Sequence, residues 1–143
     1  RDVPAGQTRD YIFGYTILND VSARDVQTAH KQWYFGKSLD GFTPIGPCIV
    51  TADAFADYPP RLGIRSFVNG EKRQDSNTAL QIFDIDHVIA ELSQGMTLKA
   101  GTIIATGTPA GVGMGMDPPQ FLKPGDVVRC EIDGIGTLTN LVK

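Results

Sequence analysis

Side chains able to do chemistry gather in three polar clusters that interrupt the apolar stretches of this chain. The first cluster, residues 19–27 (NDVSARDVQ), places two carboxylates, an arginine and an amide after an apolar run. The second, residues 36–42 (GKSLDGF), is a loop flanked by glycines, and the third is residues 105–113 (ATGTPAGVG). Polar groups at strand ends and in loops commonly line a binding or catalytic cleft. The pattern therefore favours a cleft built from these three segments.

Each candidate side chain in these clusters also has a structural interpretation. Asp20 fits a carboxylate that caps the following helix. Arg24 fits an ion pair with Asp25, or a group that fixes the orientation of the Asp20 carboxylate. Lys37 taken alone is typical of a solvated lysine, and Thr108 of a tight turn between glycines. Residue type alone favours the structural interpretation of Asp20, Arg24 and Lys37 over a functional one.

Several familiar motifs fail on spacing. Residues 36–38 (GKS) resemble the end of a phosphate-binding loop, but the glycine required at position 31 is a lysine. The glycine-rich residues 107–115 do not complete the G-x-G-x-x-G pattern of dinucleotide-binding proteins. The chain also has no G-x-S-x-G nucleophile motif. Neither nucleotide-binding motif is therefore present, and the sequence argues against a serine hydrolase with a G-x-S-x-G nucleophile.

Composition limits the class of protein further. The chain has 143 residues, 41% of them hydrophobic, which suits one domain. A net charge of −3 argues against nucleic-acid binding, and no apolar run is long enough to span a membrane. Cys48 and Cys130 are too few for a disulfide framework and lie in apolar or strand-like stretches, so we expect a cytoplasmic protein.

The elements that must position the three clusters are mostly strands. Alternating or β-branched residues predict strands over 11–18, 46–51, 62–68, 100–105, 126–132 and 136–142. Asn69 and Gly70 predict a type I′ hairpin turn. Helical spacing predicts a helix over 85–94, capped by Asp84 or Asp86 and stopped by Gly95, and a shorter helix over 22–31. The expected fold class is mainly β (α+β).

Four strings carry a resemblance to a known family. NDVSARDVQ, WYFGKSLDGFTPIGP, VNGEKRQ and TGTPAGVG, the last followed by FLKPGDVVRCEIDGIGTLTN, occur in this order between residues 11 and 142. Together they resemble the fumarylacetoacetate hydrolase family. The resemblance implies that family's mixed β-sheet roll with few peripheral helices, central strands at 11–18 and 100–105, and a homodimer.

The resemblance also implies a metal site and a role for each matching residue. Family members hold a divalent cation, usually Mg²⁺ with Mn²⁺ or Ca²⁺ as alternatives, on two glutamates of an E-x-E motif and one aspartate, which matches Asp20. Such a cation takes oxygen ligands and leaves positions for a 2-oxo acid. Lys37 matches a catalytic lysine that faces the substrate's developing negative charge. Gln27 and Thr108 match substrate contacts, Thr108 at the carboxyl end.

The glutamates are where the chain departs from the family. None of Glu71, Glu91 and Glu131 belongs to an E-x-E pair. In the family that motif, and the histidine and glutamate that activate water, lie upstream of the region matching Arg1. We interpret residues 1–143 as a single, N-terminally incomplete catalytic domain. A shortened, non-catalytic β domain is the alternative.

The predicted function is metal-dependent hydrolysis of a C–C bond in an acylpyruvate or fumarylacetoacetate-like 1,3-dioxo acid, through an enolate that the metal stabilises. The alternative within the family is isomerisation or decarboxylation of an oxo-diacid in aromatic catabolism. The expected partner is a small-molecule oxo acid, with no nucleic acid and no membrane.

Overall fold

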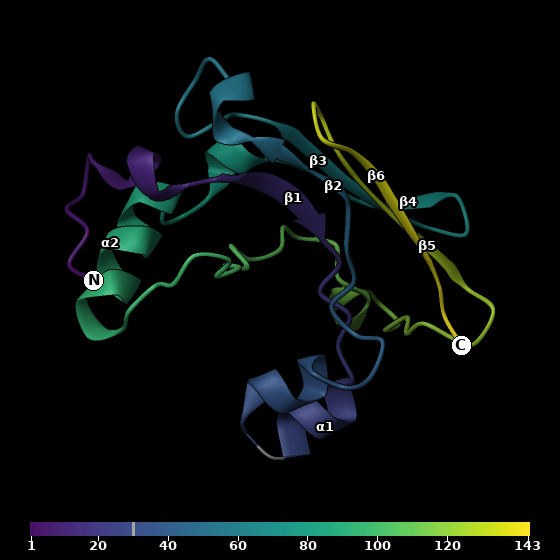
Figure 1. The fold of residues 1–143 in the computed structure, drawn as a ribbon. Coiled ribbons are helices and arrows are strands. Elements are labelled where there is room, and N and C mark those ends of the chain that lie inside the picture. The colour runs from purple at the N-terminus through teal and green to yellow at the C-terminus, as the bar shows by residue number, and fades with distance from the viewer. Residues whose placement is uncertain (30) are drawn as a thin grey trace.

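The structure, a computed structural model, describes residues 1–29 and 31–143. Within these residues, six strands form two antiparallel sheets, and the helices lie outside the sheets (Figure 1). One sheet pairs β1 (Gly14–Leu18) with β2 (Ile45–Thr51). The other has the order β4 (Glu71–Asn77), β3 (Gly63–Val68), β5 (Val127–Ile132), β6 (Gly136–Leu141). The predicted mainly β fold is confirmed.

The helices are short. The α-helices are α1 (Arg24–Ala29) and α2 (Ile85–Gly95), and the 3₁₀ turns are η1 (Thr8–Tyr11), η2 (Trp33–Lys37), η3 (Ala52–Ala54), η4 (Thr78–Leu80) and η5 (Gly113–Gly115). The helix predicted over 22–31 is thus present but shorter, and residue 30 lies outside the described residues. In Figure 1, α1 lies apart from the sheets, whereas α2 lies beside the N-terminal segment.

The β3–β4 hairpin has the predicted turn and one irregularity. Asn69 and Gly70 have φ angles of 52° and 84°, as a type I′ turn requires. Ser66 pairs with Gln74 and Phe67 with Lys72, so Arg73 is an extra residue on β4. This two-against-one pairing is a β-bulge, a feature that bends a strand and changes the direction of its side chains.

Helix α2 is held by its cap and by the start of the chain. The Asp84 carboxylate accepts a hydrogen bond from the His87 N–H at 2.8 Å, which confirms the predicted N-cap. The backbone N–H of Val3 donates to Ser93 Oγ at 2.9 Å, and the Thr8 hydroxyl donates to Asp86. We call residues 2–8, which make these contacts, the N-terminal clasp.

Two sequence predictions about secondary structure are wrong, one about the end of α2 and one about a strand. Gly95 does not stop α2 in a left-handed conformation but is its last helical residue, and the Met96 N–H closes the turn on the Leu92 carbonyl at 3.1 Å. Residues 100–105 form no strand, and no described strand pairs with them. A strand needs a neighbouring strand to form hydrogen bonds with its backbone N–H and C=O groups. The exposure of Ile103, which is 59%, shows that this segment is also not covered by other residues.

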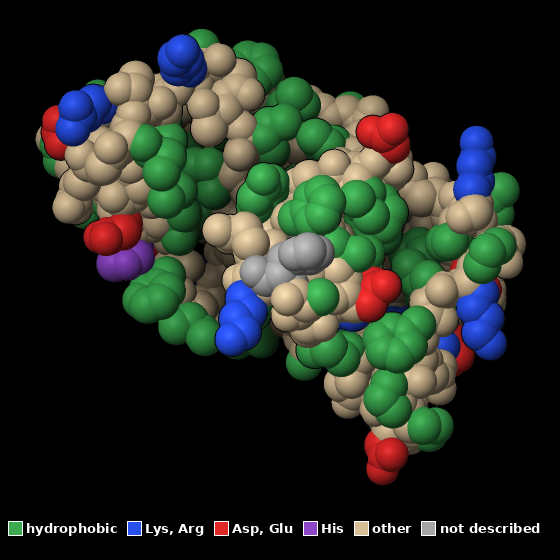
Figure 2. Space-filling view, turned by 90° about the horizontal axis from the view of Figure 1, so that it is seen from below, with side chains coloured by type: hydrophobic (Ala, Val, Ile, Leu, Met, Phe, Trp, Pro, Cys, Tyr) green, Lys and Arg blue, Asp and Glu red, His purple; other side chains and the backbone are tan. Residues whose placement is uncertain are grey.

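The core is small and much apolar surface is exposed. Its buried hydrophobic residues are Val3, Ile17, Ile89, Val128 and Ile135. Large apolar side chains such as Phe13 and Ile82 are 75% and 93% exposed. Figure 2 shows hydrophobic side chains across much of the face seen from below, with charged groups in isolated places. Apolar surface of this extent is typical of a face that packs against more protein. Among the described residues, no helix has the length and apolar character needed to cross a membrane.

Candidate active site

Asp20 and Lys37, from the first and second clusters, meet in the structure. Asp20 follows the end of β1, and Lys37 is the last residue of η2. The Lys37 ammonium lies 2.6 Å from Asp20 Oδ2 and 3.1 Å from Ser22 Oγ. The side chains of Lys37 and Asp20 are 27% and 32% exposed, so solvent or a small molecule can reach the pair.

A glycine lets η2 lie directly against α1, and this contact places Lys37. The Ala23 N–H donates to the Gly36 carbonyl at 2.8 Å. A Cβ at Gly36 would lie 2.8 Å from the Ala23 carbonyl oxygen and 2.9 Å from the Gln27 nitrogen. The Thr43 hydroxyl then donates to the Lys37 carbonyl at 2.7 Å and fixes the far end of η2.

Gln27 and Arg24 form a second polar pair on α1. Gln27 is only 4% exposed, and its side-chain oxygen accepts a hydrogen bond from Arg24 Nη1 at 2.7 Å. The structure therefore shows Arg24 bonded to Gln27, and not the contact with Asp20 or the ion pair with Asp25 that the sequence suggested. Asp20 precedes the first helical residue by four positions, so it does not stand at the N-cap of α1.

Thr108 lies in the third cluster, against the second sheet. Its hydroxyl oxygen accepts a hydrogen bond from Gln74 Nε2 on β4 at 2.9 Å. The hydrogen bond that the structure shows for Thr108 thus comes from β4 and not from the residues around Asp20. Sequence reasoning singled out neither Gln74 nor Ser22. Both lie inside the strings that carry the family resemblance, which was the available signal.

The donor set around Asp20 fits a hard cation in kind but not in number. Asp20 offers carboxylate oxygen, the ligand that Mg²⁺ and Ca²⁺ prefer. The described residues contain no group of three or more His, Cys, Asp or Glu side chains that could hold a metal ion. Asp20 can therefore serve as one ligand of such an ion, and the chain's described residues do not complete the site.

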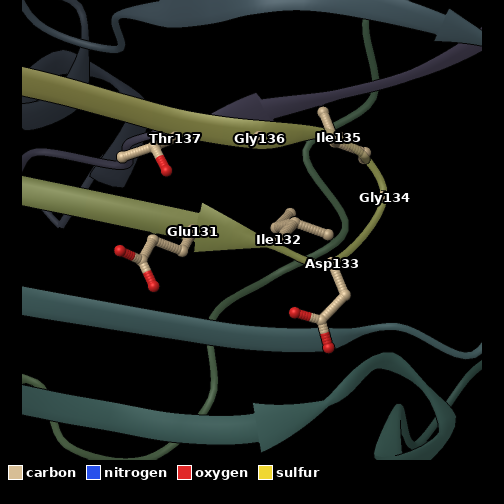
Figure 3. A pocket seen from close by; sticks show the side chains of 7 residues that line it. All are labelled: Glu131, Ile132, Asp133, Gly134, Ile135, Gly136 and Thr137. Atoms are coloured by element: carbon tan, nitrogen blue, oxygen red, sulfur yellow. The ribbon is translucent and has the colours of Figure 1, made fainter.

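A hollow of about 520 Å³ lies elsewhere, at the β5–β6 hairpin, and is lined by residues 131–137 (Figure 3). Two carboxylates, those of Glu131 and Asp133, lie on the same side of it in that view. Arg65 pairs with Asp133 at 2.8 Å, and Arg129 lies 3.0 Å from Glu131. Both carboxylates are thus paired with arginines, and none of the predicted site residues lines this hollow.

The fold defines the class of protein to which the chain belongs. It superposes with a TM-score of 0.96 on a solved structure of a fumarylacetoacetate hydrolase from Exiguobacterium antarcticum, at 52% identity, covering 100% of this chain and 51% of that one. Residues 1–143 also match the family model described as fumarylacetoacetate (FAA) hydrolase C-terminal. The chain belongs to the fumarylacetoacetate hydrolase family.

Two further relatives differ in their named reactions. Oxaloacetate tautomerase YisK of Bacillus subtilis is 52% identical over 133 residues, which are 93% of this chain and 44% of that protein. A 2-hydroxyhepta-2,4-diene-1,7-dioate isomerase from Mycobacterium marinum is 47% identical with a TM-score of 0.87, covering 99% of this chain and 52% of that one. The chain spans about half the length of these relatives. The relatives are named as a hydrolase, an isomerase and a tautomerase, so family membership does not fix the reaction.

Proposed function

We propose that this chain forms part of a metal-dependent enzyme that hydrolyses a C–C bond in an acylpyruvate or fumarylacetoacetate-like 1,3-dioxo acid. The observation that carries the proposal is the meeting of Asp20 and Lys37 at 2.6 Å. They come from separate segments that the family strings single out, and they lie where a small molecule can reach them. A metal-binding carboxylate beside an ammonium suits a reaction that develops negative charge on an oxygen.

Each residue has a defined part in this proposal. Asp20 would be one ligand of Mg²⁺, with further oxygen ligands from outside these 143 residues. When bound, the cation would supply positive charge to the substrate oxygen that becomes negative as the C–C bond breaks. Lys37, held near Asp20 and Ser22, would add a second positive charge at that oxygen. Gln27 and the Thr108 hydroxyl would bind polar groups of the oxo acid.

Two features of the whole protein belong to the same proposal. Residues 1–143 would be part of a larger catalytic domain, which is supported by their covering 44–52% of the relatives named above. A homodimer is supported by exposed apolar residues, such as Trp33 and Tyr34, each 65% exposed. Dimerisation would remove part of this surface from water.

Isomerisation or tautomerisation of an oxo-diacid is the second candidate. It is favoured by the 52% identity to a protein named oxaloacetate tautomerase and the 47% identity to a named isomerase. The two candidates share their use of a 2-oxo acid and the stabilisation of negative charge on its keto oxygen. They differ in whether water then cleaves the carbon skeleton.

To test these candidates, the full-length protein that contains this chain is assayed in the presence of Mg²⁺ with acetylpyruvate and, separately, with oxaloacetate. Hydrolysis of acetylpyruvate would release acetate and pyruvate, and pyruvate is measured with lactate dehydrogenase. Tautomerisation of oxaloacetate is followed by its enol absorbance. Pyruvate release supports the first candidate, and enol–keto exchange alone supports the second. Neither reaction, together with no Mg²⁺-dependent binding of oxalate, would support the non-catalytic β domain instead.

A matched pair of variants tests the site itself. Asp20→Asn keeps the shape of the side chain but removes its charge, so Mg²⁺-dependent turnover should be lost. Asp25→Asn makes the same chemical change five residues away on an exposed side chain, and its turnover should stay near wild type. Mg²⁺-dependent turnover that survives Asp20→Asn would overturn the assignment.

A further inference from the structure

Gln74, on the edge strand β4, joins Ser66 of the neighbouring strand β3 to the loop that contains Thr108. The Ser66 hydroxyl donates to Gln74 Oε1 at 2.8 Å, and Gln74 Nε2 donates to Thr108 Oγ1 at 2.9 Å and to the Pro109 carbonyl at 2.7 Å. A carbonyl oxygen can only accept a hydrogen bond, so the nitrogen end of the amide must face the loop. The orientation of the Gln74 amide is therefore determined by its partners.

This orientation decides what the Thr108 hydroxyl can do. A threonine hydroxyl has one proton to donate and two lone pairs that accept. Gln74 occupies one lone pair of Thr108, and an amide N–H cannot accept the hydroxyl proton. The proton therefore points away from the Gln74 nitrogen, and Thr108 is exposed. A hydroxyl with this geometry is suited to donate to an anionic acceptor, the stronger type of hydrogen bond.

The backbone brings the same loop to the same place independently of the Gln74 side chain. A Cβ at Gly111 would clash with the Arg73 carbonyl oxygen and would lie 3.1 Å from Gln74 Cγ. Gly111 also has a φ of 106°, which favours glycine. Arg73 is the extra residue of the β4 bulge, and its Nη1 lies 2.8 Å from Met116 Sδ, three residues beyond the loop. The bulge thus contacts the loop through its main chain and the following segment through the Arg73 side chain.

We propose that Gln74 is a positioning residue for substrate binding. It fixes the 105–113 loop on β4 and presents the Thr108 hydroxyl proton to a carboxylate of the substrate. Gln74 itself does not touch the substrate in this arrangement. The proposal rests on the proposed function, because the carboxylate is that of the oxo acid.

A double-mutant cycle on the full-length protein with Mg²⁺ tests this role. Gln74→Met keeps the length of the side chain without its hydrogen bonds, and Thr108→Val removes the hydroxyl but keeps the shape. Each should weaken oxalate binding, measured by calorimetry, by about tenfold or more, because a hydrogen bond to a charged group is lost or misdirected. The double variant should bind oxalate as the Thr108→Val variant does. The KM of the substrate should rise more than its kcat falls.

Controls separate a positioning role from a structural one. Lys72→Met, two residues along β4, removes an exposed side chain paired with Asp75 and should bind oxalate normally. Should Gln74→Met fail to fold, Ser66→Ala replaces it, since it releases only the amide oxygen. Ser66→Ala should then weaken oxalate binding in the wild-type background and not in the Thr108→Val background.

The outcomes distinguish this inference from the proposed function. If the wild-type protein binds oxalate and Gln74→Met binds it equally well, only the role of Gln74 is overturned. The same conclusion follows if the losses of the two single variants add in the double variant. A wild-type protein that binds no oxalate with Mg²⁺ would overturn both proposals.

Discussion

Replacing Gly36 by alanine tests whether η2 must lie directly against α1. The new Cβ would lie 2.8 Å from the Ala23 carbonyl oxygen and 2.9 Å from both the Cβ and the backbone nitrogen of Gln27. Rotation of a side chain cannot relieve these contacts, so η2 must shift and Lys37 must move with it. Overpacking of this kind costs about 1–3 kcal/mol, which lowers Tm by about 3–10 °C in a domain of this size.

Thermal unfolding followed by circular dichroism measures the effect, and Gly95→Ala is the matched control. Gly95 ends α2 with no atom within 4 Å of a new Cβ, so alanine should stabilise the protein by about 0.5–1 kcal/mol. Gly36→Ala should also reduce the Mg²⁺-dependent stabilisation by oxalate, because Lys37 is displaced. A Gly36→Ala variant whose Tm equals that of the wild type and which keeps the stabilisation by oxalate would refute the reasoning.

Three further predictions concern the core, the acid limb of stability and the thiols. Ile17 is 2% exposed, so Ile17→Ala should cost about 2–5 kcal/mol in urea denaturation, and a loss below about 1 kcal/mol would contradict its place in the core. Hydrogen bonds from the Thr8 hydroxyl and from backbone N–H groups lower the pKa of Asp86. A lowered folded-state pKa contributes stability above the unfolded-state value, about 4, that is lost as pH falls through the folded-state value. Asp86→Asn should therefore make the loss of stability in acid shallower, and an unchanged acid limb would count against this network. Burial raises the pKa of the Cys130 thiol while Cys48 is exposed, so iodoacetamide should label Cys48 first by mass spectrometry; equal rates would contradict the burial.

Strands were predicted correctly where a strand-like residue pattern coincides with a neighbouring strand in the structure. Residues 46–51, 62–68 and 126–132 alternate or carry β-branched side chains, and each has a neighbouring strand in this chain. Residues 100–105 have an equally apolar pattern but no described neighbour. Apolar pattern indicates that a segment favours burial, whereas strand formation also needs a second backbone, which the pattern of one segment does not reveal.

The site was predictable only in part for a related reason. Motif strings located Asp20 and Lys37, and the structure brings them together. The contact between Gln74 and Thr108 depends on the bulge at Arg73, which shifts the pairing of β4 by one residue. A bulge breaks the period of two on which strand interpretation rests. The hydrogen bond of Arg24 to Gln27 likewise depends on a choice among several nearby acceptors.

The N-terminal clasp has a consequence for the order of folding. Its hydrogen bonds to α2 join residues 78 to 91 positions apart, whereas two residues connect β3 to β4. Closing a long loop lowers the conformational entropy of the chain before the contacts it brings together can stabilise the structure. Contacts between distant residues therefore form late in folding. We expect amide hydrogens of α2 to exchange with solvent before those of β3. The N-terminal clasp thus contributes to the stability of a helix that begins at Ile85, far along the chain.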